Sequence, residues 1–186
     1  MSTMPLQQAI AVSHSVLTNV TPDQLDLPTP CASWKVSDLI NHMVGAHHFF
    51  AAALAGQPPS PPASDFSAGD FVAEFDNAAA ADLAAFSAEG VMEKTFKLPF
   101  GEMPGAAFAG LAASDTFTHA WDLAKATGQS TDLAPALAEG LLAAARTSIP
   151  ESFRGPDGKA PFGSIAEAPA GATTADQLAA FLGRAV

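Results

Sequence analysis

The 186-residue sequence contains no tyrosine, a single cysteine and few basic residues. Because Cys31 has no second thiol to pair with, a disulfide within the chain and a zinc site made of cysteines alone are excluded. Eight Lys and Arg residues stand against 19 Asp and Glu residues, and the formal net charge is −11. A chain this acidic repels the phosphates of nucleic acids and of anionic membranes, so we expect neither as a partner.

The sequence also lacks the basic region of a signal peptide near residues 1–17, and it has no uniformly apolar stretch of about 18 residues. Together with the lone cysteine, this predicts a cytoplasmic protein. Glycine-rich phosphate loops are missing, as are the GxSxG, CxxC and HExxH motifs. Phosphoryl transfer and dinucleotide chemistry therefore have no support in the sequence.

Alanine is abundant instead, at 41 of 186 residues, and β-branched residues are few, which favours helix. Apolar residues at helical spacing predict four helices. The first covers about 6–20, the second begins after a Ser33 cap and ends at Gly56, the third runs from about 71 and is terminated by Gly90, and the fourth covers 105–127. Between residues 92 and 105 the apolar residues alternate among prolines and glycines, which predicts a short extended crossover segment or hairpin. The predicted fold class is mainly α, with a four-helix bundle at its centre.

The rest of the chain predicts a small helical C-terminal appendage. One helix is expected around 133–149, followed by a Pro- and Gly-rich stretch and a closing helix from Thr173, which has capping-box spacing with Asp176. We therefore divide the chain into a bundle, residues 1–129, and an extension, residues 130–186. The extension is expected to pack on the bundle and form one structural domain with it.

The helix predicted over 105–127 carries polar residues where apolar ones are expected. Asp115, His119 and Asp122 lie in the same stripe as its apolar residues. A buried carboxylate is costly unless it is paired or binds a metal. Asp115 and His119, at i and i+4, could supply two metal ligands, and His42 on the second helix is the leading candidate for the third. Asp122 and Asp38, each one helical turn from one of these histidines, are expected to orient them.

Other interpretations of these residues stay open. A His and Asp pair at this spacing is more often a surface ion pair or a satisfied core histidine than a metal site. His47 and His48 are adjacent and face different directions, so contact with core or solvent is favoured for them. Cys31 is more typical of a small buried apolar residue than of a nucleophile. Around any metal, Trp34, Phe49 and Phe108 are candidates for apolar pocket walls.

Two segments carry a resemblance to a known family. PTPCASWKVSDLINHMVG at 28–45 and DTFTHAWDLAKATG at 115–128 resemble the actinobacterial metal-binding proteins of the DinB-like superfamily, which are related to the mycothiol-dependent maleylpyruvate isomerases. The likeness extends to LPFGEMPG at 98–105 and FLGR at 181–184. It implies a four-helix bundle with a divalent metal, usually zinc and sometimes nickel.

Carried over residue by residue, the resemblance assigns the metal ligands to His42, Asp115 and His119, the residues that the stripe argument also selects. The isomerases have Glu at the position of Asp115, so the shorter side chain here reaches about one methylene less far. They also have a larger C-terminal domain with a substrate-binding arginine. The basic candidates in this chain are Arg146, Arg154 and Arg184, and none is a clear equivalent.

The resemblance implies a metal-dependent enzyme that activates a low-molecular-weight thiol, mycothiol by analogy. The thiolate would add to a small electrophilic substrate, either isomerising a double bond or transferring sulfur. One alternative is a non-catalytic metal-binding protein, such as a stress-related sensor or an interaction module. Another is a metal-free polar network. The superfamily also suggests a homodimer. The sequence identifies neither the substrate nor the residues that bind it.

Overall fold

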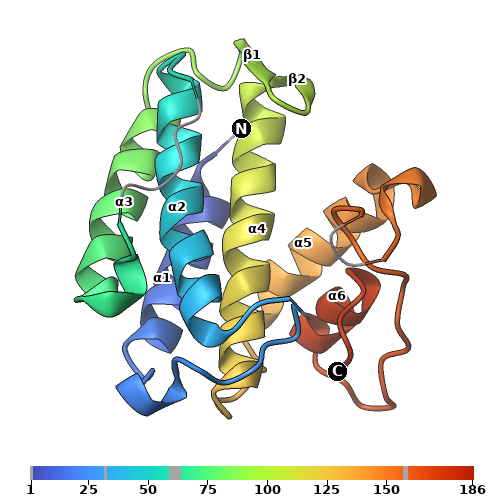
Figure 1. The fold of residues 1–186 in the computed structure, drawn as a ribbon. Helices are drawn as coiled ribbons and strands as arrows, with labels where there is room; N and C mark the ends of the chain where they lie inside the picture. Colours follow the sequence, from blue (N-terminus) through green and yellow to red (C-terminus); the bar gives the residue numbers. More distant parts are fainter. Residues whose placement is uncertain (1, 32, 59–63, 157–158) are drawn as a thin grey trace.

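Four long helices form a bundle in the computed structural model, which describes residues 2–31, 33–58, 64–156 and 159–186 (Figure 1). They are α1 (Met4–Leu17), α2 (Val36–Leu54), α3 (Phe71–Phe86) and α4 (Gly105–Ala126). The prediction of a mainly α fold is confirmed. Within the described residues, none of the helices is both long enough and apolar enough to cross a membrane.

The start of α2 differs from the sequence prediction, because Ser33 does not cap it. The N-cap is Lys35, whose backbone N–H donates to the Asp38 carboxylate at 3.0 Å. Before the helix, the Trp34 N–H donates to the Cys31 carbonyl at 2.8 Å, which closes a turn, and the Thr29 N–H donates to the Trp34 carbonyl. Residues 33 and 34 are therefore held in a turn, and the helix begins only after it.

The crossover between α3 and α4 is a hairpin, as predicted. Strands β1 (Thr95–Leu98) and β2 (Gly101–Pro104) are antiparallel, with Leu98 opposite Gly101. Gly105 follows at once and begins α4. A Cβ atom on Gly105 would lie 1.9 Å from the Val91 carbonyl oxygen, so only glycine fits where the hairpin joins the helix.

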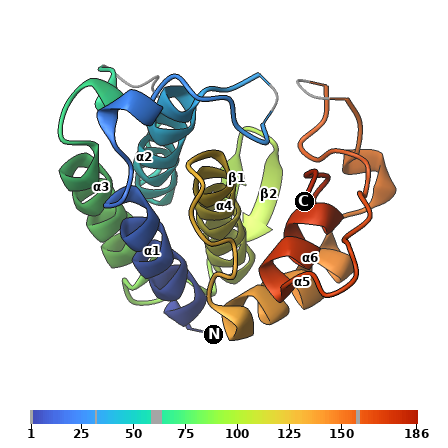
Figure 2. The same cartoon turned by 90° about the horizontal axis from the view of Figure 1, so that it is seen from below.

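Two further helices, α5 (Pro135–Ser148) and α6 (Thr174–Phe181), lie on the other side of α4 from α3 (Figure 2). The predicted capping box starts α6: the Asp176 N–H donates to Thr173 Oγ1 at 3.1 Å, and the Thr173 N–H donates to the Asp176 carboxylate at 3.3 Å. Three short 3₁₀ helices complete the secondary structure of the described residues: η1 (Pro22–Gln24), η2 (Phe66–Ala68) and η3 (Glu151–Phe153).

The core has two parts that meet along α4. One lies between α1, α2 and α3 and contains Ile40 and Phe75. The other contains Phe117 and Trp121 of α4 together with buried residues of α5 and α6, among them Leu178. The C-terminal helices therefore share an apolar core with the bundle, and α4 is buried between the two parts.

Candidate metal centre

Three side chains from two helices converge at a cavity that is also lined by residues of the C-terminal extension. Asp115 and His119 lie one turn apart on α4, and His42 faces them from α2. Nε2 of His42 lies 3.6 Å from Oδ2 of Asp115, and Nε2 of His119 lies 3.6 Å from Oδ1 of the same carboxylate. Their ligand atoms all lie within 4.8 Å of one another. The structure thus brings together the three residues predicted as metal ligands.

The spacing of these atoms fits a metal ion better than a hydrogen-bonded network. Two ligands bound to a tetrahedral zinc ion at 2.0 to 2.2 Å lie about 3.4 Å apart, close to the 3.6 Å separations here. A separation of 3.6 Å is too long for a hydrogen bond. Nε2 of His42 is buried and has no hydrogen-bond partner among the described residues. Two imidazole nitrogens and a carboxylate are also a ligand set that zinc accepts.

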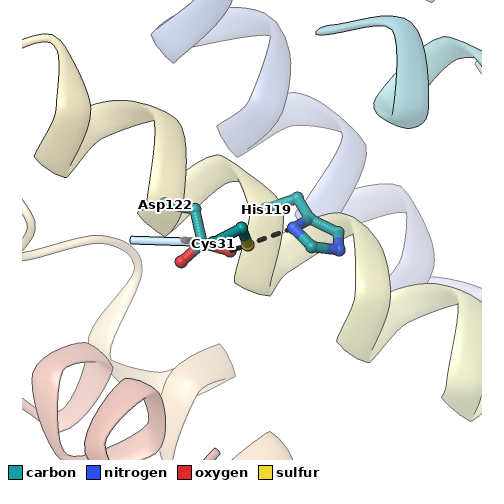
Figure 3. Close-up of side chains that lie close together, drawn as sticks. All are labelled: Cys31, His119 and Asp122. Atoms are coloured by element: carbon teal, nitrogen blue, oxygen red, sulfur yellow. Dashed lines mark hydrogen bonds and ion pairs between the residues drawn. The ribbon is translucent and has the colours of Figure 1, made fainter. Parts of the chain in front are cut away.

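Asp122 orients His119 through the ring nitrogen that faces away from Asp115. Its Oδ2 lies 3.0 Å from Nδ1 of His119, and the side chain is fully buried (Figure 3). Because an ionised carboxylate can only accept, Nδ1 of His119 carries a proton directed at Asp122, and Nε2 is the ring nitrogen that faces Asp115 and could bind a metal. The structure places Asp122 where an orienting residue was predicted. Asp38 is placed elsewhere: it is exposed, and its carboxylate accepts from the Lys35 N–H at the helix start.

Asp122 has two further partners that the sequence did not reveal. Arg184 donates twice, from Nε to Oδ1 at 3.2 Å and from Nη2 to Oδ2 at 3.1 Å. The Cys31 thiol donates to Oδ2 at 3.3 Å, and Figure 3 shows its sulfur beside His119. Cys31, His119 and Asp122 form a second trio of groups able to bind a metal. In it, however, the carboxylate is already shared with Arg184.

The charges at the site favour a cation beside Asp115. Burial by itself would raise the pKa of Asp115, but the neighbouring imidazoles of His119 and His42 outweigh it and hold this pKa well below its usual range. Burial lowers the pKa of His119, yet Asp115 and the hydrogen bond to Asp122 raise it well above its usual value. Without a metal, a proton on His119 therefore supplies the positive charge between the two carboxylates.

A cavity of about 590 Å³ opens beside the three side chains. The Trp34 indole covers part of the site, with its ring centre 4.7 Å from that of His42 and 5.6 Å from that of His119. The C-terminal extension closes the opposite side. The lining residues are Pro30, Cys31, Ser33, Trp34, His42, Leu111, Ser114, Asp115, Thr118, His119, Gly155, Ala160, Pro161, Phe162, Gly163, Leu182, Gly183 and Arg184.

Two of the three predicted apolar walls lie elsewhere. Trp34 lines the cavity, but Phe108 is fully buried in the core. Phe49 lines a different cavity, beside the hairpin. Both were suggested as apolar residues near the metal, and helical spacing alone does not show which neighbour covers a side chain.

The other α2 histidines do not reach the site. His47 is buried and pairs through Nδ1 with Asp82 of α3 at 2.8 Å. His48 is exposed and stacks on Phe66, with ring centres 5.6 Å apart. These placements agree with the prediction of core and solvent contacts for this pair.

Comparison with known proteins identifies a family that this chain resembles. The model of the mycothiol maleylpyruvate isomerase N-terminal domain matches residues 6–124, the four-helix bundle with all three candidate ligands. Two uncharacterized proteins of Mycobacterium tuberculosis, Rv0738 and MT0763, are each 49% identical over 183 residues, which cover 98% of this chain and 97% of the relative. No solved structure matches the chain.

Proposed function

The chain belongs to the family of the mycothiol maleylpyruvate isomerase N-terminal domain, and from this premise we propose that it is a metal-dependent enzyme that activates a low-molecular-weight thiol. His42, Asp115 and His119 would hold the ion, with zinc as the first candidate and nickel as the alternative. The observation that carries the proposal is the position of the 590 Å³ cavity beside these ligands. A metal held there by three protein ligands keeps a coordination position for a small molecule.

The chemistry that a divalent ion supplies when bound is a lowered pKa of a coordinated thiol, so that the thiolate exists at neutral pH. The protein's own groups support this. Neutral imidazoles of His42 and His119 present Nε2, and Asp115 balances part of the ion's charge. Asp122 keeps the His119 proton on Nδ1, and Arg184 compensates the charge of Asp122. The Trp34 ring packs against the His42 ring.

In this proposal the thiolate, mycothiol by analogy with the family, attacks an electrophilic carbon of a small substrate. A carbon–sulfur bond forms as a π pair moves onto the substrate's oxygen. If the thiolate is expelled again after rotation, a double bond is isomerised. If a proton is taken up instead, the product is an S-conjugate. The open cavity favours this enzyme over a non-catalytic metal-binding protein, whose site would be closed to solvent.

The first experiment measures metal per chain in protein purified without an affinity tag. We expect about one divalent ion in the parent, loss of that ion in His119→Ala, and retention in the matched control His48→Ala, because His48 is exposed and distant from the ligands. A cobalt-substituted sample is then titrated with 2-mercaptoethanol. Appearance of a thiolate-to-cobalt charge-transfer band supports thiol activation, and a parent protein without metal would refute the proposal.

A further inference from the structure

A second histidine–aspartate contact, apart from the candidate metal centre, lies in the core between α2 and α3, which run side by side (Figure 1). Nδ1 of His47 is 2.8 Å from Oδ2 of Asp82, and the two side chains are 1% and 0% exposed. The rings of Phe50 and Phe75 pack edge-on against the imidazole, with ring centres 6.2 and 5.1 Å away. Neither His47 nor Asp82 lines the cavity beside the candidate ligands. The proposed function therefore leaves this pair without a role.

The surface of the same bundle carries a contact of the same length. Nδ1 of His14 on α1 lies 2.8 Å from Oδ1 of Asp76 on α3, but these side chains are 47% and 45% exposed. Water screens any charge on the exposed pair, so this pair can gain or lose a proton at little cost. A net charge on the buried pair would have no such screening. Burial, rather than the contact itself, therefore restricts the protonation of His47 and Asp82.

One protonation state leaves the buried pair without a net charge. A neutral imidazole beside an ionised carboxylate is negative overall, and the addition of two protons makes the pair positive. With one added proton the pair is neutral overall, whether that proton lies on Nδ1 of His47 or on Oδ2 of Asp82. Because an uncompensated buried charge is strongly unfavourable, the fold favours the pair with one added proton.

The surroundings of Asp82 support this protonation state. Its Oδ1 atom is buried and has no hydrogen-bond partner among the described residues. An ionised carboxylate would leave part of its charge on this oxygen without a donor, whereas a carboxyl protonated on Oδ2 has only a neutral carbonyl oxygen there. Burial also raises the pKa of Asp82, and this effect exceeds the opposing effect of the hydrogen bond and the charge of His47.

The other titratable side chains of the surrounding elements do not compensate a charge on the pair. Those on α1 to α4 and β1 that lie outside the candidate metal centre are all exposed: His14, Asp38, His48, Glu74, Asp76, Lys97 and Lys125. Those of the centre contact one another: His42, Asp115, His119 and Asp122. Among the described residues, His47 is the one neighbour whose charge affects the pKa of Asp82. The neutrality of the pair therefore depends on the proton that it holds.

We propose that His47 and Asp82 hold one added proton between Nδ1 and Oδ2 and act as a proton-dependent lock between α2 and α3, which weakens as the pH rises above neutral. In an unfolded chain, a free imidazole and a free carboxyl are both deprotonated well above pH 6.5. The folded chain then binds one proton more than the unfolded chain, so the contribution of the pair to the free energy of unfolding falls as the pH rises. Below about pH 6.5 a free imidazole is protonated too, and this dependence ends.

The variant Asp82→Asn tests whether the folded pair holds this proton. Asparagine keeps the shape of the side chain, and its carbonyl oxygen accepts a hydrogen bond from a neutral His47 without an added proton. Urea denaturation of the full-length parent and variant gives the unfolding equilibrium constant of each from pH 5.5 to pH 8.5. A free carboxyl is ionised throughout this range, so the ratio of the parent's constant to the variant's should rise about tenfold per pH unit. A ratio that does not change with pH would overturn the proposal.

Asp76→Asn is the matched control, because it removes the carboxylate from the exposed contact of the same length. Here the ratio should change by less than about twofold per pH unit, and a tenfold change in both variants would overturn the role of burial. NMR of the 15N-labelled parent gives a second readout that needs no variant. We expect the ring nitrogens of His47 to keep the same signals from pH 5.5 to pH 8.5. A shift of these signals by the gain or loss of a proton would also overturn the proposal, whatever the cobalt titration shows.

Discussion

Asp122 connects the candidate ligands to the rest of the molecule. Its carboxylate receives hydrogen bonds from His119 on its own helix, from the Cys31 thiol before α2 and from Arg184 near the C-terminus. Burial raises its pKa, but His119 and Arg184 outweigh burial and lower the pKa below its usual value. The ionised form is therefore the one that the fold stabilises.

Replacing Asp122 by Asn tests this arrangement. The variant loses the charge that orients His119 and compensates Arg184, so we expect metal affinity to fall about 10- to 100-fold. Because Arg184 keeps a largely buried charge without its partner, unfolding should cost about 3 to 5 kcal/mol less. Chelator competition and urea denaturation measure the two effects. Asp38→Asn is the matched control. Since Asp38 contacts the start of α2, metal affinity should stay unchanged, and a similar loss in both variants would contradict the assignment.

The pH dependence of metal binding follows from His119. Its pKa is raised well above the usual 6.5 when no metal is bound, so the folded protein holds this proton at neutral pH. A metal must displace the proton, and affinity therefore falls as the pH falls. We expect the decline to begin above pH 7, by about tenfold per pH unit for one proton released. Zinc affinity measured by chelator competition from pH 9 to pH 6 checks this, and a flat profile there would contradict ligation by His119.

Some site residues could be predicted from the sequence, and others could not. Asp115, His119 and Asp122 interrupt an apolar stripe on one helix, and this pattern is visible in the sequence. Arg184 and Cys31 are 62 and 91 residues from Asp122, and only the packing of loops and extension brings them together. Spacing also failed for Asp38, because a carboxylate in the first turn of a helix can serve the helix N-terminus as well as a histidine one turn later.

Among the secondary-structure elements, the helices and the hairpin were predictable because each has its own period and its own breaking residues. The helix predicted from the Ser33 cap to Gly56 and the helix predicted from about 71 to Gly90 correspond to α2 and α3, which are each a few residues shorter than predicted. The prediction of Ser33 as the N-cap was wrong because backbone hydrogen bonds form a turn before the helix. The preference of serine for N-cap positions does not reveal such competing hydrogen bonds. The packing of the residues after α6 could not be predicted from the sequence either, because it depends on a close approach between Gly183 and Gly163.

That approach joins Gly183, after α6, to Gly163 in the cavity wall. Gly183 has φ of +92°, and a Cβ atom there would lie 2.5 Å from the Gly163 Cα atom. Gly183→Ala should therefore displace the wall and Arg184 beside it, and lower the free energy of unfolding. Gly171→Ala is the matched control, because Gly171 has φ of +81° with open space around it.

The control isolates the backbone strain, which costs about 1 to 3 kcal/mol in either variant. We expect Gly183→Ala to lose about 2 kcal/mol more than Gly171→Ala in urea denaturation, as overpacking does. Equal losses of stability in the two variants would show that the contact with Gly163 does not restrict residue 183.

The bundle and the extension share one apolar core. We expect the bundle to need the extension, because buried residues of α5 and α6 share a core with Phe117 and Trp121 of α4, and Trp121 Nε1 donates to Asp176 at 2.9 Å. A chain of residues 1–129 would expose this apolar face and leave Asp122 without Arg184. We expect this chain to lack the single cooperative transition that the full chain shows in calorimetry, and to bind zinc at least about tenfold more weakly. A sharp transition with full zinc affinity in the shortened chain would show that the bundle folds alone, and that the extension only closes the cavity.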